Sequence, residues 1–129
     1  MFFQIDFSNG LPVYQQVVRQ VKFAVAGGAL KAGELVPSVR ELSRELAINP
    51  NTVARAFRQL QADGVLETVR GMGLQVAAGA QQQCRQERVT LIRQRLQQVL
   101  VEARQSRLAA DELRALVDGE LAAIEQLEV

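Results

Sequence analysis

Histidine and tryptophan are absent from this sequence of 129 residues, and cysteine occurs once, at Cys84. Without histidine, the chain lacks the commonest general base and the partner that activates a serine or cysteine nucleophile. A single cysteine cannot form a disulfide within the chain, so cysteine usage gives no sign of an oxidising compartment. These absences predict that the protein is not an enzyme and that Cys84 is an idle thiol rather than a redox switch.

Metal-binding and membrane-spanning patterns are also missing from the sequence. The acidic residues do not show the spacing of a calcium-binding loop, so no metal or other cofactor is expected. No apolar run approaches the roughly 18 residues of a membrane span. No basic segment typical of a signal peptide precedes the first apolar residues. The sequence therefore predicts a cytoplasmic protein without a membrane partner.

Neither sign of charge is in marked excess. The net charge is +1, and residues 1–79 carry eight basic and six acidic side chains, whereas residues 80–129 carry seven and eight. Bulk electrostatics alone does not indicate a nucleic-acid-binding protein. Any such function has to depend on where individual arginines lie.

Helical spacing of apolar residues begins at Tyr14 and predicts a first helix of about 16 residues. The segment before it, FQIDF at residues 3–7, alternates apolar and polar residues and is expected to form a short strand or an ordered arm. Tyr14 and Phe57 are expected to lie in the hydrophobic core.

Two further helices are predicted close together. Ser38-Val-Arg-Glu41 has the pattern of a capping box, in which serine and glutamate satisfy each other's free N–H groups at a helix start. Asn49 followed by Pro50 is a second start signal, because asparagine caps helices well and proline is favoured at the first helical position. Gly64 is placed to end this third helix. Two short helices joined by so tight a turn predict a helix-turn-helix.

The third predicted helix, residues 50–63, has two chemically distinct faces. One face is apolar and comprises Val53, Ala56, Phe57 and Leu60. The opposite face is polar and basic and carries Asn51, Arg55 and Arg58, with Thr52 and Gln59 on its flank. Such a helix fits the DNA major groove, where arginine suits guanine and asparagine suits adenine.

Two short β-prone runs follow, VLETVR at residues 65–70 and LQVAA at 74–78, joined by Gly71-Met-Gly73. This pattern predicts a hairpin, the wing of a winged helix. Its glycine-rich tip allows close approach of the backbone to a partner, and Arg70 lies beside that tip.

The remainder of the chain predicts a helical tail. Residues 77–83 are expected to form a link, and a break near residues 106–110 separates two amphipathic helices. Because so small a unit cannot make a core by itself, we expect the tail to pair with a second copy. The residues expected at this dimer interface are apolar at helical spacing: Val89, Ile92, Leu96, Val99, Leu113, Val117, Leu121 and Ile124.

Residues 11–76 resemble the DNA-binding domain of the GntR family of bacterial transcription regulators. The matching segments include PSVREL, NPNTVARA and ETVRGMG, in the family's order and spacing. The short helical tail resembles the YtrA-type subfamily, whose members lack a large effector-binding domain. Ala47 is a departure, since the family often has glycine at this place in the turn.

The resemblance implies which residues contact DNA. They come from the start of the second helix, the first turns of the third helix and the wing tip: Ser38, Arg40, Asn49, Asn51, Thr52, Arg55, Arg58, Arg70, Gly71 and Gly73. It also implies repression of the protein's own operon or of a nearby transporter operon. A small-molecule effector is a further family expectation, but no residue marks its site.

The sequence thus predicts a mainly α fold with a small β-wing. Residues 1–79 are expected to form a winged helix-turn-helix DNA-binding domain, and residues 80–129 a two-helix dimerisation hairpin. The expected function is that of a homodimeric transcription regulator on a pseudo-palindromic operator in double-stranded DNA. The alternative is a winged helix used for protein interaction without specific DNA binding.

Overall fold

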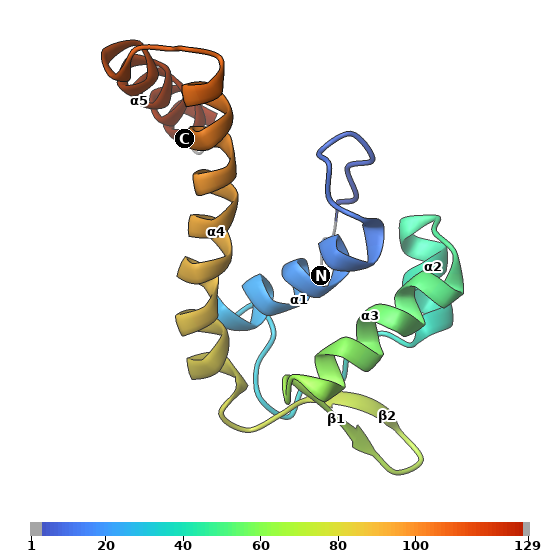
Figure 1. Cartoon of the computed structure of the whole chain (residues 1–129). Coiled ribbons are helices and arrows are strands. Elements are labelled where there is room, and N and C mark those ends of the chain that lie inside the picture. Colours follow the sequence, from blue (N-terminus) through green and yellow to red (C-terminus); the bar gives the residue numbers. More distant parts are fainter. Residues whose placement is uncertain (1–3, 128–129) are drawn as a thin grey trace. The chain divides into compact units, whose positions relative to one another are not determined.

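The computed structural model describes residues 4–127, which form five helices and two strands (Figure 1). The chain divides into two compact units, Met1–Val89 and Thr90–Val129. The expected fold class, mainly helical with a small β-wing, is confirmed. Within residues 4–127, no helix is both long and apolar enough to cross a membrane.

Helix α1 spans Val13–Ala26, close to the expected first helix. The segment before it does not form a strand over residues 4–7 but is an ordered arm, and Phe3 lies outside the described residues. Gln16 fastens this arm, because its side chain accepts a hydrogen bond from the Asp6 N–H and donates one to the Asp6 carbonyl oxygen.

Helices α2, Val39–Leu46, and α3, Pro50–Ala62, form the helix-turn-helix. The predicted capping box is present: the Ser38 hydroxyl oxygen accepts from the Glu41 N–H, and the Glu41 carboxylate accepts from the Ser38 N–H. The chain turns through Ala47, which has the left-handed backbone conformation with φ 54° and ψ 47°. Glycine adopts this conformation more easily than alanine. This explains why the family resemblance predicts glycine at this position of the turn.

Strands β1, Leu66–Val69, and β2, Gly73–Val76, form the predicted hairpin with antiparallel pairing of Leu66 to Val76. The other edge of β2 is covered by residues 33–36, through hydrogen bonds that include Val36 N–H to the Leu74 carbonyl oxygen. This additional pairing was not predicted. It fastens the wing to the segment that leads into α2.

The core of the first unit lies between α1, α3 and the hairpin. Phe57 belongs to it, as predicted, whereas Tyr14 is half-buried and packs against its edge. The other core side chains are mainly aliphatic and include Val17, Val21, Val25, Leu42, Val53, Leu60 and Val76.

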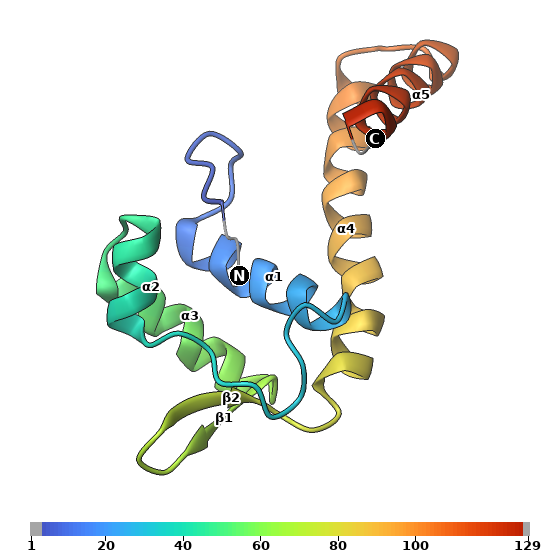
Figure 2. The same cartoon turned by 180° about the vertical axis from the view of Figure 1, so that it is seen from behind.

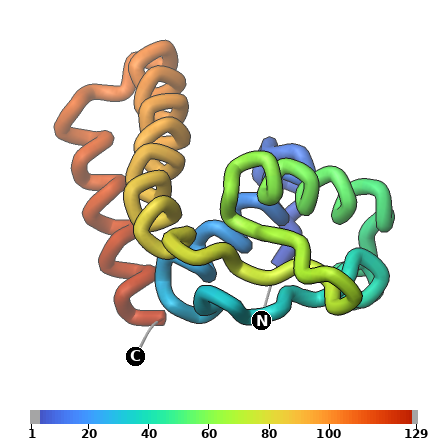
Figure 3. The backbone as a smooth tube through the Cα atoms, turned by 90° about the horizontal axis from the view of Figure 1, so that it is seen from below, coloured from blue at the N-terminus to red at the C-terminus, as the bar shows by residue number. Residues whose placement is uncertain are grey.

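Helix α4, Ala80–Gln105, follows the hairpin after a short connection (Figure 3). The predicted link over residues 77–83 was therefore too long, because its last four residues are helical. Ala80 and Cys84 are buried in the core of the first unit, and this packing extends that unit through Val89, beyond the boundary predicted at residue 79.

The second unit consists of the later part of α4 and of α5, Ala110–Leu127, joined by a turn at residues 106–109 (Figure 2). The turn lies where the sequence predicted a break. Among the described residues of this unit, Ala103 alone is buried, and α5 buries none. Most apolar side chains of this unit are therefore exposed within the part of the chain that the structure describes.

Candidate nucleic-acid interface

The start of α3 is shaped by its cap. Asn49 is the N-cap residue, and its side-chain oxygen accepts a hydrogen bond of 2.8 Å from the Asn51 N–H. Pro50 takes the first helical position, where no N–H is needed. The Asn49 side chain keeps its NH₂ group as a donor, so capping does not exclude a contact with DNA.

The exposed face of α3 carries the predicted polar side chains. Asn51, Arg55 and Arg58 are exposed, and Thr52 is half-buried on the flank. The four predicted apolar residues of the opposite face are buried. This division confirms the predicted faces of the helix, and it leaves the donors of α3 pointing away from the core.

Arg55 has an unexpected neighbour on α1. Its guanidinium carbon lies 3.7 Å from the centroid of the Tyr14 ring, which is a close cation–π contact. Sequence reasoning placed Tyr14 in the core and missed this contact. The two residues are far apart in the chain, so no local periodicity could have paired them.

The start of α2 contributes two more predicted residues, Ser38 and Arg40. Both are exposed. The Ser38 oxygen accepts the capping hydrogen bond at 3.1 Å, but its hydroxyl proton remains able to donate to a phosphate. The Arg40 side chain extends from the first turn of α2 and makes no ion pair with a described residue.

The wing tip comprises Arg70, Gly71, Met72 and Gly73, all exposed. Gly71 and Gly73 have φ of +78° and +118°, values that side-chain-bearing residues rarely adopt. Glycine is thus required by the turn itself, whether or not the tip touches DNA. Met72, which was not predicted as a site residue, is 67% exposed at this tip.

The arginines of these elements have no carboxylate partner in the part of the chain that the structure describes. Within residues 4–127, no ion pair joins Arg40, Arg55, Arg58 or Arg70 to an acidic side chain. Their guanidinium groups can therefore donate to phosphates or base edges without first breaking an internal pair. Together with the polar start of α3, they form a surface chemically suited to duplex DNA.

A winged helix-turn-helix with such a surface defines a transcription regulator that acts through DNA. The chain belongs to the gntR family of bacterial regulatory proteins, whose pattern matches residues 13–76. It is similar to the HTH-type transcriptional repressor YtrA of Bacillus subtilis, with 36% identity over 100 residues that cover 78% of this chain and 77% of the relative.

Solved structures agree with this assignment. A transcriptional regulator from Oenococcus oeni has a TM-score of 0.62 and 31% identity, and the match covers 93% of this chain and 99% of that one. The DNA-binding domain of AraR, in complex with operator ORE1, has a TM-score of 0.51 and 25% identity over 60% of this chain and 94% of that domain.

These likenesses confirm the predicted family, the YtrA-like character and the function as a transcription regulator rather than an enzyme. The individual DNA-contacting residues and the dimer residues stay predictions.

Proposed function

We propose that the protein is a homodimeric repressor that binds a pseudo-palindromic operator through α3 and the wing. The observation that carries this proposal is the exposed face of α3, where arginine and amide side chains project from a capped helix start and form no ion pair with any of residues 4–127. Regulation of its own operon or of a nearby transporter operon is part of the proposal by resemblance. Because its target is DNA, we place its action in the cytoplasm.

Each element of the surface has its own proposed role. Asn49, Asn51, Thr52 and Arg55 face base edges in the major groove, where donors and acceptors differ between base pairs. Arg58 and Ser38 contact phosphates, and Arg40 reaches a base edge or a phosphate. The wing tip, Arg70 with Gly71 and Gly73, approaches the minor groove, where arginine responds to groove width.

The dimer is proposed from the apolar seam of the tail. Val89, Ile92, Leu96 and Val99 recur at helical spacing along α4 and are 48–55% exposed. On α5, Val117, Leu121 and Ile124 are exposed and Leu113 is half-buried. A contiguous apolar stripe of this kind marks an interaction surface. Pairing with a second copy would bury both helices and place two α3 helices on half-sites about 10 bp apart.

A small-molecule effector stays an expectation. The described tail has an open groove of about 520 Å³ beside the turn between α4 and α5, lined by Leu100, Leu108 and Leu113 among others. Its lining is mostly apolar and does not specify the chemical class of a ligand.

Selection of bound sequences from random duplex DNA tests the proposed function, with purified full-length protein at about 150 mM salt. Enrichment of an inverted repeat with fixed half-site spacing would support a sequence-specific dimer. Binding of that sequence should weaken steeply as salt rises, because phosphate contacts release counterions. Absence of enrichment by folded protein would favour the interaction module without specific DNA binding.

A further inference from the structure

The contact between Arg55 and Tyr14 joins the recognition surface to a helix outside the helix-turn-helix. Tyr14 lies in the first turn of α1 and packs, half-buried, against the core. Arg55 lies on the exposed side of α3, and its guanidinium covers the Tyr14 ring at 3.7 Å from the centroid. The ring therefore provides a fixed platform beneath a side chain that is otherwise exposed.

The stack leaves the donors of Arg55 available. A guanidinium that lies over an aromatic ring uses its face for the contact, whereas its N–H groups lie around the edge of the plane. Among residues 4–127, no hydrogen bond or ion pair involves the Arg55 guanidinium. The edge of the guanidinium can thus meet the two acceptors of a guanine while the ring holds its face.

Holding this side chain matters because arginine has many rotamers. An unrestrained arginine loses that freedom when it binds a base, and a side chain that is already ordered loses less. None of the other proposed DNA-contacting arginines, Arg40, Arg58 and Arg70, has a described aromatic platform. Arg55 is therefore the arginine of this surface best prepared for directional, base-specific contact.

We propose that Tyr14 is a positioning residue for sequence recognition, which orients the Arg55 guanidinium toward one base pair of each half-site. This inference rests on the proposed function and adds a specificity determinant on α1. Tyr14 itself does not need to touch DNA. Its aromatic ring, not its hydroxyl, does the positioning, since the hydroxyl contacts Gln15 of the same helix at 3.3 Å.

The test compares Tyr14→Phe, which keeps the ring, with Tyr14→Leu and Tyr14→Met, which keep apolar bulk without it. Affinity of Tyr14→Phe for the selected operator should stay within about twofold of the wild-type value. Affinity of the other two variants should fall about 2- to 30-fold, which corresponds to the energy of a cation–π contact. Affinity for random duplex DNA should be unchanged. Thermal unfolding identifies which of the two ring-free variants remains folded.

A double-mutant cycle separates positioning from a general structural effect. In the Arg55→Ala background, Tyr14→Leu should cause no further loss of operator affinity, and both single variants should lose preference at the same base pair. Phe23→Leu is the matched control, because it removes the ring beneath Arg19, 5.5 Å away in the same helix. It should leave base preference unchanged.

The outcomes distinguish the inference from the function on which it rests. If the wild-type protein selects no sequence, the proposed function fails and takes the inference with it. If the wild type selects an operator and the folded ring-free variants bind it as tightly as the wild type does, the inference alone is overturned. The same holds if Tyr14→Leu lowers operator affinity as much in the Arg55→Ala background as it does in the wild type.

Discussion

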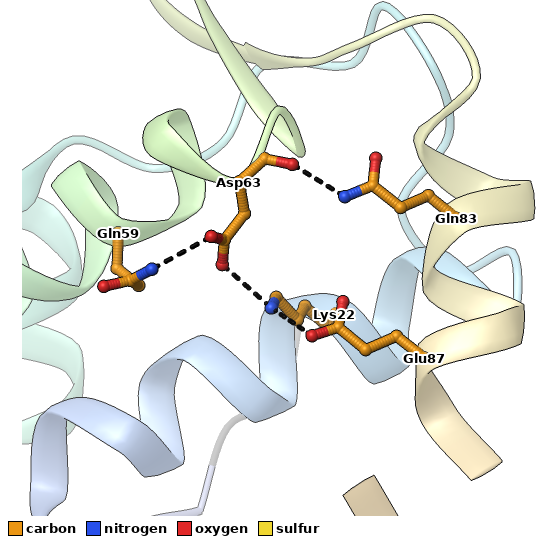
Figure 4. Close-up of polar contacts among 5 residues, drawn as sticks. All are labelled: Lys22, Gln59, Asp63, Gln83 and Glu87. Carbon is orange, nitrogen blue, oxygen red and sulfur yellow. Dashed lines mark hydrogen bonds and ion pairs between the residues drawn. The ribbon is translucent and has the colours of Figure 1, made fainter. Parts of the chain in front are cut away.

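The ammonium group of Lys22 donates a hydrogen bond of 2.9 Å to a carboxylate oxygen of Asp63, which joins the middle of α1 to the C-cap of α3 (Figure 4). A second carboxylate, that of Glu87 on α4, lies 2.7 Å from the same nitrogen. Gln83 of α4 and Gln59 of α3 also donate to Asp63. The cluster connects the end of α3 to the first turns of α4 inside the first unit.

Replacing Lys22 with methionine should destabilise the first unit. The Lys22 side chain is 6% exposed, so its removal leaves two carboxylates facing each other near the core. The side chains of Asp63 and Glu87 are 28% and 33% exposed, so water offsets part of this loss. We expect the free energy of unfolding to fall by about 1–3 kcal/mol. Urea unfolding followed by circular dichroism measures this change. Lys31→Met, at an exposed lysine, is the control and should be nearly neutral.

The contribution of Lys22 should also depend on alkaline pH. Burial disfavours its charged form, but the hydrogen bonds and charges of Glu87 and Asp63 outweigh this and raise the pKa above the usual 10.5. A raised folded-state pKa contributes stability that is complete below 10.5 and is lost as pH rises through the folded value. The difference in unfolding free energy between wild type and Lys22→Met should therefore stay constant from about pH 8 to about pH 10. It should shrink above pH 10.5. A constant difference at higher pH would contradict the assigned charge interaction.

Ala47→Gly should stabilise the helix-turn-helix. Ala47 is exposed and has φ 54°, so its methyl group contributes strain without packing. Glycine removes the strain of this left-handed conformation, which should raise the free energy of unfolding by about 1 kcal/mol. The greater freedom of glycine in the unfolded chain offsets part of this gain. The melting temperature should rise. Ala54→Gly, within α3, should instead lower it by the helix-propensity difference; an unchanged or lower melting temperature for Ala47→Gly would argue against strain.

Local signals account for what the sequence could predict. The capping residues Ser38 and Asn49 act within a few positions of themselves, so their helices were placed nearly correctly. The start of α4 was missed because burial of Ala80 and Cys84 against the first unit, a tertiary effect, makes the glutamine-rich segment helical. The pairs Lys22–Asp63 and Tyr14–Arg55 join residues distant in sequence, and only the folded chain brings them together.

Arg40→Ala and Arg55→Ala should each weaken binding of the selected operator by about 1–3 kcal/mol if they read bases. Fluorescence anisotropy with labelled duplexes measures this loss. The same variants on a random duplex provide the control: a base-reading arginine affects the operator more than the random sequence, whereas equal weakening identifies a phosphate contact. Unchanged operator affinity in both variants would remove Arg40 and Arg55 from the proposed set of DNA-contacting residues.

Charging the tail seam should separate the proposed dimer. In Leu96→Glu with Leu121→Glu, two exposed apolar positions on α4 and α5 acquire charges that a paired interface would have to desolvate. We expect a monomer in sedimentation experiments, with a folded first unit and much weaker binding of the inverted repeat. Gln98→Glu with Gln126→Glu is the matched control, since these residues are also exposed but lie on the other side of each helix. This control should remain dimeric, because its charges stay in water. A stable dimer of the seam variant would refute the proposed interface, and the apolar stripe would then need another partner.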